Sequence, residues 1–577
     1  MAKYDRVIKN GIIVDGTRQP RFRGDIGISN GLIAKIGSID ESDAGEILDA
    51  SGLIVAPGFV DLHTHYDSQV FWDPYCTISG WHGVTSVVIG NCGFGFAPVK
   101  PEEREYAMLS MTRVEAIPLA AMKAGMPWDW VTFPEFLDSI ERTPKSVNIL
   151  PYVPLGPLMI WVMGLKDAKA GRMPTPAEHA EMGRLLNQAM DAGACGWSAQ
   201  RLVPGNPGGQ QNDHDGTPMV TDVMHDETAI EMAKVLRKRN DGFIQMTLLS
   251  PDPGHDRKHI EDLATVSGRP VVMNVVGWND SDASIHRDTL AWLKSCRDRG
   301  IRVVGQGDTV AAPWMFKLDE WNMFDDSEAW KDATLGTFEE RKAKMADPAR
   351  RAALREVPKT VIPVFGEIVL IGPKTEKNEK WRDYTLAHIA KETGKHPVDV
   401  MLDIAVEEDL QTEFQGDRAR NNLKYLKEIV QDPFVIFGVS DGGAHTRFLT
   451  GGRFPTETIV RFVRENDVIS LEEAHWRLST LPALVAGFRE RGTLVEGAPA
   501  DVVVYDYEKL HVVDDEIARD QPGGEWRRIQ RASGYRFILV NGEVTIRDDK
   551  ETNTHSGDLL RHGGGRRDRG DDLLAAE

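Results

Sequence analysis

Two histidines, His63 and His65, stand one residue apart at the end of an apolar stretch. In a β-strand, side chains two positions apart lie on the same face, so both imidazoles are expected to point the same way. A neutral imidazole is a common metal ligand, and two on one face form half of a metal site. The pattern equally suits two histidines that only hydrogen-bond at a strand end.

Two further strand ends carry candidate ligands. Cys92 lies between glycines, directly after the apolar run Val84–Ile89. Its thiolate would be a good zinc ligand, although a lone cysteine in such a place is more often a buried residue without a role. Asp441 follows the run Phe434–Val439. Its carboxylate could bind a metal and accept a proton from water, or it could cap a helix.

The rest of the chain must bring these strand ends together. From residue 58 on, strand patterns alternate with helical ones, and this rhythm predicts an α/β fold, a parallel (β/α)8 TIM-like barrel with its site at the C-terminal ends of the strands. The expected strands are 53–62, Val84–Ile89, Val147–Val153, Ala194–Ala199, Phe243–Leu248, Pro270–Val276, Ile301–Val304 and Phe434–Val439.

Both ends of the chain have a β-pattern instead. We expect residues 1–57 and 487–548 to form one small discontinuous β-sandwich domain beside a barrel at 58–486. Asn-Gly pairs at residues 10–11, 30–31 and 541–542 are hairpin signals, because both turn positions tolerate positive φ. Residues of about 310–385 form an insertion that is either a lid or an ordinary connection, and 549–577 form a tail with little to bury.

The composition narrows the classes of partner. The chain has 577 residues, 41% of them hydrophobic, and a net charge of −20, which argues against nucleic acid or an anionic membrane as a partner. Four cysteines in such a length are no disulfide framework, and no apolar run suits a leader or a membrane span. We expect a cytoplasmic protein that acts on a small molecule and possibly forms a homo-oligomer.

These motifs together resemble a known family. Asp61-x-His63-x-His65 after Pro57-Gly58, with the flanking β-segments and Ser440-Asp441-Gly442, resembles the amidohydrolase superfamily. The Gly90-Asn91-Cys92-Gly93 segment narrows the resemblance to its N-acyl-D-amino-acid deacylase (D-aminoacylase) branch, where such a cysteine bridges the metals. The closing segments Leu481-Pro482-Ala483 and 491–501 are similar too. The resemblance covers nearly the whole chain and is specific to the branch, not to a substrate.

The resemblance implies roles for particular residues. His63, His65, Cys92 and Asp441 would hold the more buried metal, with zinc the expected ion, and Asp441 would also be the general base. Arg447 matches an arginine that meets the substrate carboxylate.

The chain also departs from the family pattern. Where the family has histidines at the ends of strands five and six, this chain has Gln245 and Asn274. Amides are poor ligands beside imidazole, so we expect one divalent metal and the loss of the second site. The two amides could instead donate hydrogen bonds to an oxyanion. Loop histidines that could replace the missing ligands are His214, His225 and His255.

The substrate-binding residues are expected to differ from the family as well. Strand seven ends in Gln306 and Asp308 instead of a tyrosine-bearing segment, and Trp161 belongs to an apolar stretch after strand three. All three are candidate substrate-binding residues, and the aromatic and methionine side chains near strand ends suggest an apolar pocket, although ordinary core packing explains them equally well.

The sequence therefore predicts a metal-dependent hydrolase that cleaves a C–N bond of amide type in a small apolar or N-acylated substrate. Ester, lactone or C–C cleavage next to a carbonyl by the same metal stays open, as does lyase or isomerase chemistry with Asp308 as the base. A catalytically silent binding protein on the same fold is the remaining alternative.

Overall fold

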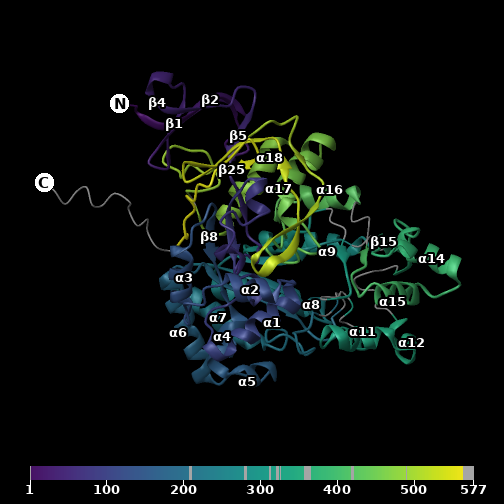
Figure 1. Ribbon diagram of the computed structural model, residues 1–577. Helices are drawn as coiled ribbons and strands as arrows, with labels where there is room; N and C mark the ends of the chain where they lie inside the picture. Colours follow the sequence, from purple (N-terminus) through teal and green to yellow (C-terminus); the bar gives the residue numbers. More distant parts are fainter. Residues whose placement is uncertain are drawn as a thin grey trace.

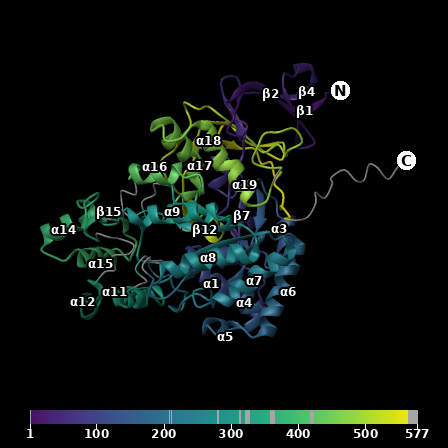
Figure 2. The same ribbon diagram turned by 180° about the vertical axis from the view of Figure 1, so that it is seen from behind.

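The structure is a computed structural model, and the ribbon is shown in Figure 1 and from behind in Figure 2. It describes residues 2–206, 209, 211–278, 282–310, 314–319, 324, 327–356, 365–416, 422–488 and 490–562. In both views the N-terminal strands lie at one end of the molecule, and the helices of the insertion lie to one side of the body that holds the site.

Parallel strands form the centre of that body. They fall into two sheets, one with the order β6–β7–β8 and one with the order β9–β10–β11–β12–β13–β17. Their bounds are β6 Phe59–Asp61, β7 Val84–Ile89, β8 Asn148–Pro151, β9 Val153–Pro154, β10 Gly196–Leu202, β11 Phe243–Leu249, β12 Val271–Val276, β13 Val303–Gly307 and β17 Val435–Phe437.

The two sheets are joined at both of their edges. Only Tyr152 separates β8 from β9, so the chain passes directly from one sheet to the other. At the other edge Thr64, just after β6, pairs in parallel with Gly442, just after β17. The chain segments after the first and last of these strands are therefore neighbours.

Helices connect successive parallel strands of these sheets. They are α1 Arg104–Glu115, α2 Leu119–Gly125, α3 Phe133–Arg142, α4 Leu155–Met163, α5 Leu165–Lys169, α6 Pro176–Ala192, α7 Asp226–Arg239, α8 Pro253–Ser267, α9 Ser284–Asp298 and α16 Leu423–Gln431. Inside, one buried cluster takes a side chain from each of several strands, among them Val60, Val88, Leu150, Phe243, Val272 and Ile436. Such a layer fills the interior and leaves the strand ends free for a site.

Strands from both ends of the chain join one nine-stranded sheet. Its order is β25–β24–β23–β18–β5–β1–β2–β3, and β4 pairs with β1. The bounds are β1 Tyr4–Ile13, β2 Phe22–Ser29, β3 Leu32–Gly37, β4 Ala44–Asp49, β5 Ile54–Pro57, β18 Val502–Tyr505, β23 Tyr535–Val540, β24 Glu543–Arg547 and β25 Lys550–Glu551.

Two of the three predicted hairpins are confirmed, at residues 30–31 and 541–542, where both turn residues have positive φ. The hairpin predicted at residues 10–11 is wrong, because β1 runs through it with a shift in its pairing to β2. Asn10 has positive φ, and a Cβ on Gly11 would lie 2.4 Å from Val55. These two residues therefore form an irregularity in a continuous strand.

The single strand expected at 53–62 is two strands. The break falls at Gly58, where a Cβ would lie 2.3 Å from the side chain of Thr85. Consequently β5 joins the nine-stranded sheet and β6 begins the parallel strands of the body.

The inserted segment contributes most of one hydrophobic cluster, from Phe316 to Phe414 and so beyond residue 385, and Ala116 and Phe448 from the body of the protein complete it. A three-stranded antiparallel sheet, β14 Trp314–Phe316, β16 Glu413–Gly416 and β15 Val369–Gly372, lies beside its helices. These are α10 Glu328–Thr334, α11 Phe338–Ala346, α12 Arg351–Leu354, α13 Glu376–Glu379, α14 Leu386–Thr393 and α15 Pro397–Glu407.

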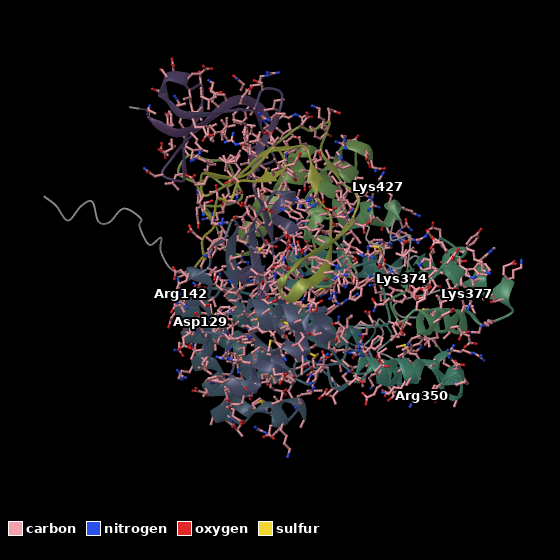
Figure 3. All side chains as sticks on the ribbon, in the orientation of Figure 1. Asp129, Arg142, Arg350, Lys374, Lys377 and Lys427 are labelled. Carbon is pink, nitrogen blue, oxygen red and sulfur yellow. The ribbon has the colours of Figure 1, made fainter. Side chains whose placement is uncertain are left out.

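The segment predicted as a tail is packed as far as residue 562. Ile149 donates a backbone hydrogen bond to Asp558, and His562 donates one to Gly193. Residues 563–577 lie outside the described part of the chain. Figure 3 labels Asp129 and Arg142, an exposed ion pair with a distance of 2.6 Å. Within the described residues, no helix is both long and apolar enough to cross a membrane.

Candidate metal centre

His63 and His65 extend from the end of β6 and are fixed by their backbone. The amide of His63 donates to Asp61 Oδ1 at 3.1 Å, and its carbonyl accepts from Ser440 Oγ at 2.8 Å. The amide of His65 donates to the carbonyl of Gly442 at 2.7 Å. The strand end that carries the histidines is therefore tied to the loop that carries Asp441.

Cys92 lies in the short loop after β7. Its backbone has a φ of 59°, which a residue with a Cβ seldom adopts, and its neighbours Gly90 and Gly93 have φ of 78° and 75°. The amide of Cys92 donates to Gln245 Oε1 at 2.7 Å, and that glutamine lies on β11. Gln245 thus holds the cysteine backbone in a conformation that aims the sulfur at the histidines.

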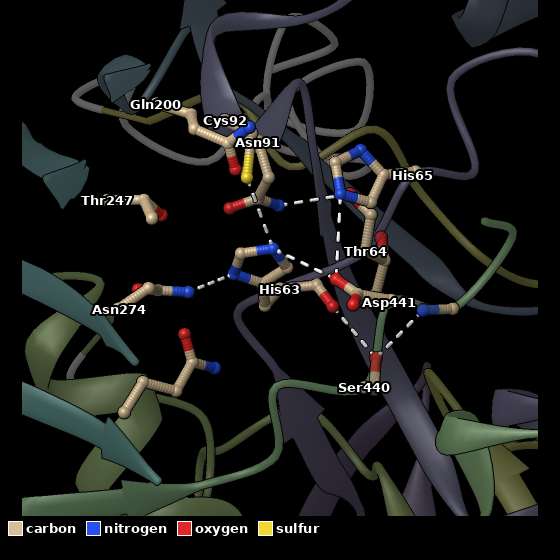
Figure 4. Close-up of polar contacts among 12 residues, drawn as sticks. His63, Thr64, His65, Asn91, Cys92, Gln200, Thr247, Asn274, Ser440 and Asp441 are labelled. Carbon is tan, nitrogen blue, oxygen red and sulfur yellow. Dashed lines mark hydrogen bonds and ion pairs between the residues drawn. The ribbon is translucent and has the colours of Figure 1, made fainter. Parts of the chain in front are cut away.

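The four candidate ligands meet at one place (Figure 4). His63 Nε2 lies 3.4 Å from Cys92 Sγ and 3.1 Å from Asp441 Oδ1, and His65 Nε2 lies 3.7 Å from the same oxygen. One ligand atom each from His63, His65 and Cys92 fall within 4.8 Å of one another. Zinc bonds of about 2.0–2.3 Å separate neighbouring ligand atoms by about 3.3–3.7 Å, so the donor set fits such an ion.

The protonation states of the candidate ligands suit a bound cation. Burial raises the pKa of the Cys92 thiol well above its ordinary value, and the nearby Glu115 and Asp441 raise it further. Burial lowers the pKa of His65, so this ring stays neutral. Burial would raise the pKa of Asp441, but hydrogen bonds from the two histidines hold it well below its usual range. The neutral imidazole of His65 and the carboxylate of Asp441 are ready to bind a metal, which would release the thiol proton.

Asn274, on β12, fixes the ring of His63. Its side-chain amide contacts His63 Nδ1, the ring nitrogen turned away from Cys92 and Asp441. An imidazole that binds a metal through Nε2 carries its proton on Nδ1 and donates it to an acceptor. The amide oxygen of Asn274 can be that acceptor once the amide is turned so that its oxygen faces the ring.

A fifth buried group, Glu115, lies at the end of α1. Its Oε1 lies 3.8 Å from His65 Nε2, and its Oε2 lies 3.2 Å from His445 Nε2. Burial raises the pKa of this carboxyl well above its ordinary value, and Asp441 and Asp67 raise it further by repulsion. Sequence reasoning missed Glu115, because one glutamate in a helical segment between two strands carries no spacing signal.

The chain is similar to known proteins over almost its entire length. A sequence model for the amidohydrolase family matches residues 46–138 and 281–546, more than half of the chain. The chain belongs to the amidohydrolase family. The comparisons support its D-aminoacylase branch and hydrolase activity.

Two relatives and one solved structure illustrate the branch. N-acyl-D-glutamate deacylase of Alcaligenes xylosoxydans xylosoxydans is 28% identical, covering 94% of this chain and 93% of that protein. D-aminoacylase of the same organism is 25% identical, covering 96% and 97%. The structure of N-acyl-D-glutamate deacylase from Bordetella bronchiseptica, complexed with zinc and a phosphonate inhibitor, has a TM-score of 0.65 at 24% identity and covers 97% of this chain and 100% of that chain.

Several residues predicted to bind substrate in this amidohydrolase have other contacts. The Arg447 guanidinium is buried and pairs with Glu525 at 2.5 Å, while the Gln306 amide donates to the carbonyl of Gly438. Trp161 lies on α4 with Lys100 5.7 Å from its ring centre, and Asp308 is half-buried just after β13.

The three loop histidines also have partners away from the metal-binding side chains. His214 Nδ1 lies 3.0 Å from Asp213, His225 Nε2 contacts the carbonyl of Gly171 at 2.9 Å, and His255 Nε2 pairs with Asp226 at 2.7 Å.

An apolar pocket adjoins the Cys92 loop of this amidohydrolase. Its walls enclose about 550 Å³, a volume that includes space open to solvent. They include Phe94, Val99, Met111, Ile160, Met219 and Val220. The ring of Phe94 also lies beside His65, with centroids 6.5 Å apart. The pocket therefore begins next to the candidate metal centre.

Proposed function

We propose that this amidohydrolase is a metal-dependent enzyme that cleaves a C–N bond of amide type in a small N-acylated substrate with an apolar group. The observation that carries the proposal is the convergence of four ligand-type side chains from three separate strand ends. His63, His65, Cys92 and Asp441 would hold one divalent ion, with zinc the expected one. When bound, such an ion polarises a carbonyl and lowers the pKa of water.

Asp441 is the general base in this proposal. It is ionised, and 26% of its side chain is exposed, so water and a substrate can reach it while the other ligands stay covered. Its carboxylate takes a proton from water as the water attacks the carbonyl carbon, and then delivers that proton to the leaving nitrogen. Asn274 and Gln245 have amide N–H groups at strand ends where the branch has histidines, and we propose that they orient the ligands and the developing oxyanion.

The apolar pocket favours an acyl group without charge. Most of its lining is aliphatic, aromatic or thioether in character, and its polar residues are Glu103, Tyr106, Ser110 and Thr221. Arg447, which the resemblance assigned to a substrate carboxylate, is neutralised by Glu525. The named deacylases suggest amide substrates, and the pocket favours those with an apolar acyl chain.

Metal content and hydrolysis, measured together on wild type and Cys92→Ala, test the proposal. We expect about one zinc per wild-type chain by elemental analysis, and hydrolysis of N-acyl amino acids that becomes faster with longer apolar acyl chains. The Cys92→Ala protein should lose both. A wild-type protein without metal after growth in zinc, or one whose hydrolysis persists at the wild-type rate in Cys92→Ala, would refute this function.

A further inference from the structure

The carboxylate of Glu115 enters the candidate metal centre from a helix, whereas all four predicted ligands come from strand ends. Its two oxygens face two different imidazoles, those of His65 at 3.8 Å and His445 at 3.2 Å. The side chains of Glu115, His65 and His445 are 4%, 1% and 5% exposed, so the group is closed to water. A carboxylate in this place interacts with the site and not with solvent.

The backbone also directs the side chain of Glu115 toward His65 and His445. Helix α1 ends at this residue, and the following Ala116 has a φ of 54°. The carbonyl of Glu115 accepts a hydrogen bond from the amide of His445 at 2.7 Å. Glu115 is thus joined to the loop after Asp441 twice, through its main chain and through its side chain.

The charge of this carboxylate has no ordinary counterion. Within the described residues its ion-pair partners are His65 and His445, and it pairs with no lysine or arginine. The carboxylates of Asp441 and Asp67 lie near enough to repel it. Ionisation of a buried carboxyl group beside other carboxylates is costly unless a cation offsets the charge. A divalent ion bound at the neighbouring histidines would be that cation.

We propose that Glu115 is a further protein ligand of the metal centre and that His445 positions its carboxylate. The inference rests on the proposed metal site. Its Oε1 and Asp441 Oδ1 lie at nearly equal distances from His65 Nε2, 3.8 and 3.7 Å, so both oxygens border the same imidazole nitrogen. Glu115 thereby supplies from α1 a donor that the amides at Gln245 and Asn274 do not provide on β11 and β12.

The test is the affinity for zinc of the full-length protein, measured by competition with a chromophoric chelator. We expect Glu115→Gln to weaken zinc binding at least 30-fold and to change the visible absorption bands of the cobalt-substituted protein. Asp67→Asn is the matched control, because Asp67 is equally buried and acidic but is paired with no imidazole in the described residues. It should weaken binding less than threefold.

Two results would overturn the inference and leave the proposed function standing: unchanged zinc affinity in Glu115→Gln, or an equal loss in Asp67→Asn, which would indicate charge alone. Wild type without zinc overturns both proposals. If Glu115→Gln does not fold, judged by circular dichroism of the metal-free protein, His445→Asn replaces it. That variant keeps the carboxylate but removes its positioning partner; we expect at least tenfold weaker zinc binding, and unchanged binding would refute the role of Glu115.

Discussion

Gln245 is the residue on which the conformation of Cys92 depends most directly. Its Oε1 accepts the Cys92 amide at 2.7 Å, and its Nε2 donates to Thr247 Oγ1 at 3.1 Å. Replacing it by methionine keeps most of its volume but removes both interactions. We expect Gln245→Met to bind zinc 10–100 times more weakly than wild type, because the cysteine is no longer held at the ligand position.

The magnitude follows from two costs at Cys92. A buried N–H without an acceptor costs about 1–3 kcal/mol. A non-glycine residue at positive φ stores a further ~1–3 kcal/mol that its surroundings must maintain, and Cys92 has a φ of 59°. Once the acceptor is gone, relaxation of the loop relieves both costs and moves the sulfur away from His63. A tenfold to hundredfold loss corresponds to about 1.4–2.7 kcal/mol, within the range of these costs.

Gln306→Met is the control for this substitution. Gln306 is another fully buried glutamine near a strand end, but its amide donates to the carbonyl of Gly438, just after β17, and does not contact the Cys92 loop. Both variants should lose stability in urea without metal, and only Gln245→Met should lose zinc affinity in the chelator competition. Equal zinc affinity in the two variants would refute the role assigned to Gln245.

Three other expectations concern the rest of the molecule. Burial lowers the pKa of His82 and of His475 from 6.5 to about 3, so the unfolded chain takes up these protons first. These two rings should together contribute up to about 2.7 kcal/mol per pH unit to the loss of stability of the metal-free protein between pH 6 and 4, and His475→Gln should lower the slope measured in urea titrations by about 1.4 kcal/mol per pH unit. Met111→Trp should narrow the apolar pocket, so kcat/KM should fall at least tenfold for substrates with long acyl chains and less than threefold for acetyl substrates. Leu109 lies on the same helix but lines another cavity, so Leu109→Trp should leave the ratio of the two kcat/KM values unchanged. Arg447→Met should cost about 1–3 kcal/mol of stability, because it leaves the carboxylate of Glu525 without this partner. The KM for substrates with a carboxylate should change less than twofold, and a tenfold rise in KM would indicate that Arg447 does bind the substrate.

The parallel strands and the places of His63, His65, Cys92 and Asp441 could be predicted because local signals specify them. Apolar runs of strand length ending in polar residues recur along the chain, and the ends of parallel strands lie at one edge of a sheet. Periodicity could not place the break at Gly58, because the apolar pattern continues across it. The steric limit from Thr85, 27 positions away in sequence, determines that break.

The partners of buried side chains could not be predicted from local pattern. Arg447 matches a substrate-binding position, yet Glu525 on a distant hairpin neutralises it. That pairing depends on how the segment after β20 Glu516–Gln521 folds back over the loop that follows β17. A sequence motif specifies the residue type at a position, whereas the charges that surround it come from contacts between remote segments.

Glu115 shows why the amides at two strand ends do not by themselves describe the site. The amides at Gln245 and Asn274 contact the Cys92 backbone and the His63 ring, so these positions still orient ligands although they contribute poor donors. The carboxylate of Glu115 reaches the site from α1, and a search for motifs at strand ends does not include this helix. In a site that keeps two imidazoles, a thiol and an aspartate, a buried carboxylate 3.8 Å from one imidazole increases the attraction for a cation and limits the space around it. The metal preference of this chain should therefore depend on Glu115 as much as on the amides of Gln245 and Asn274.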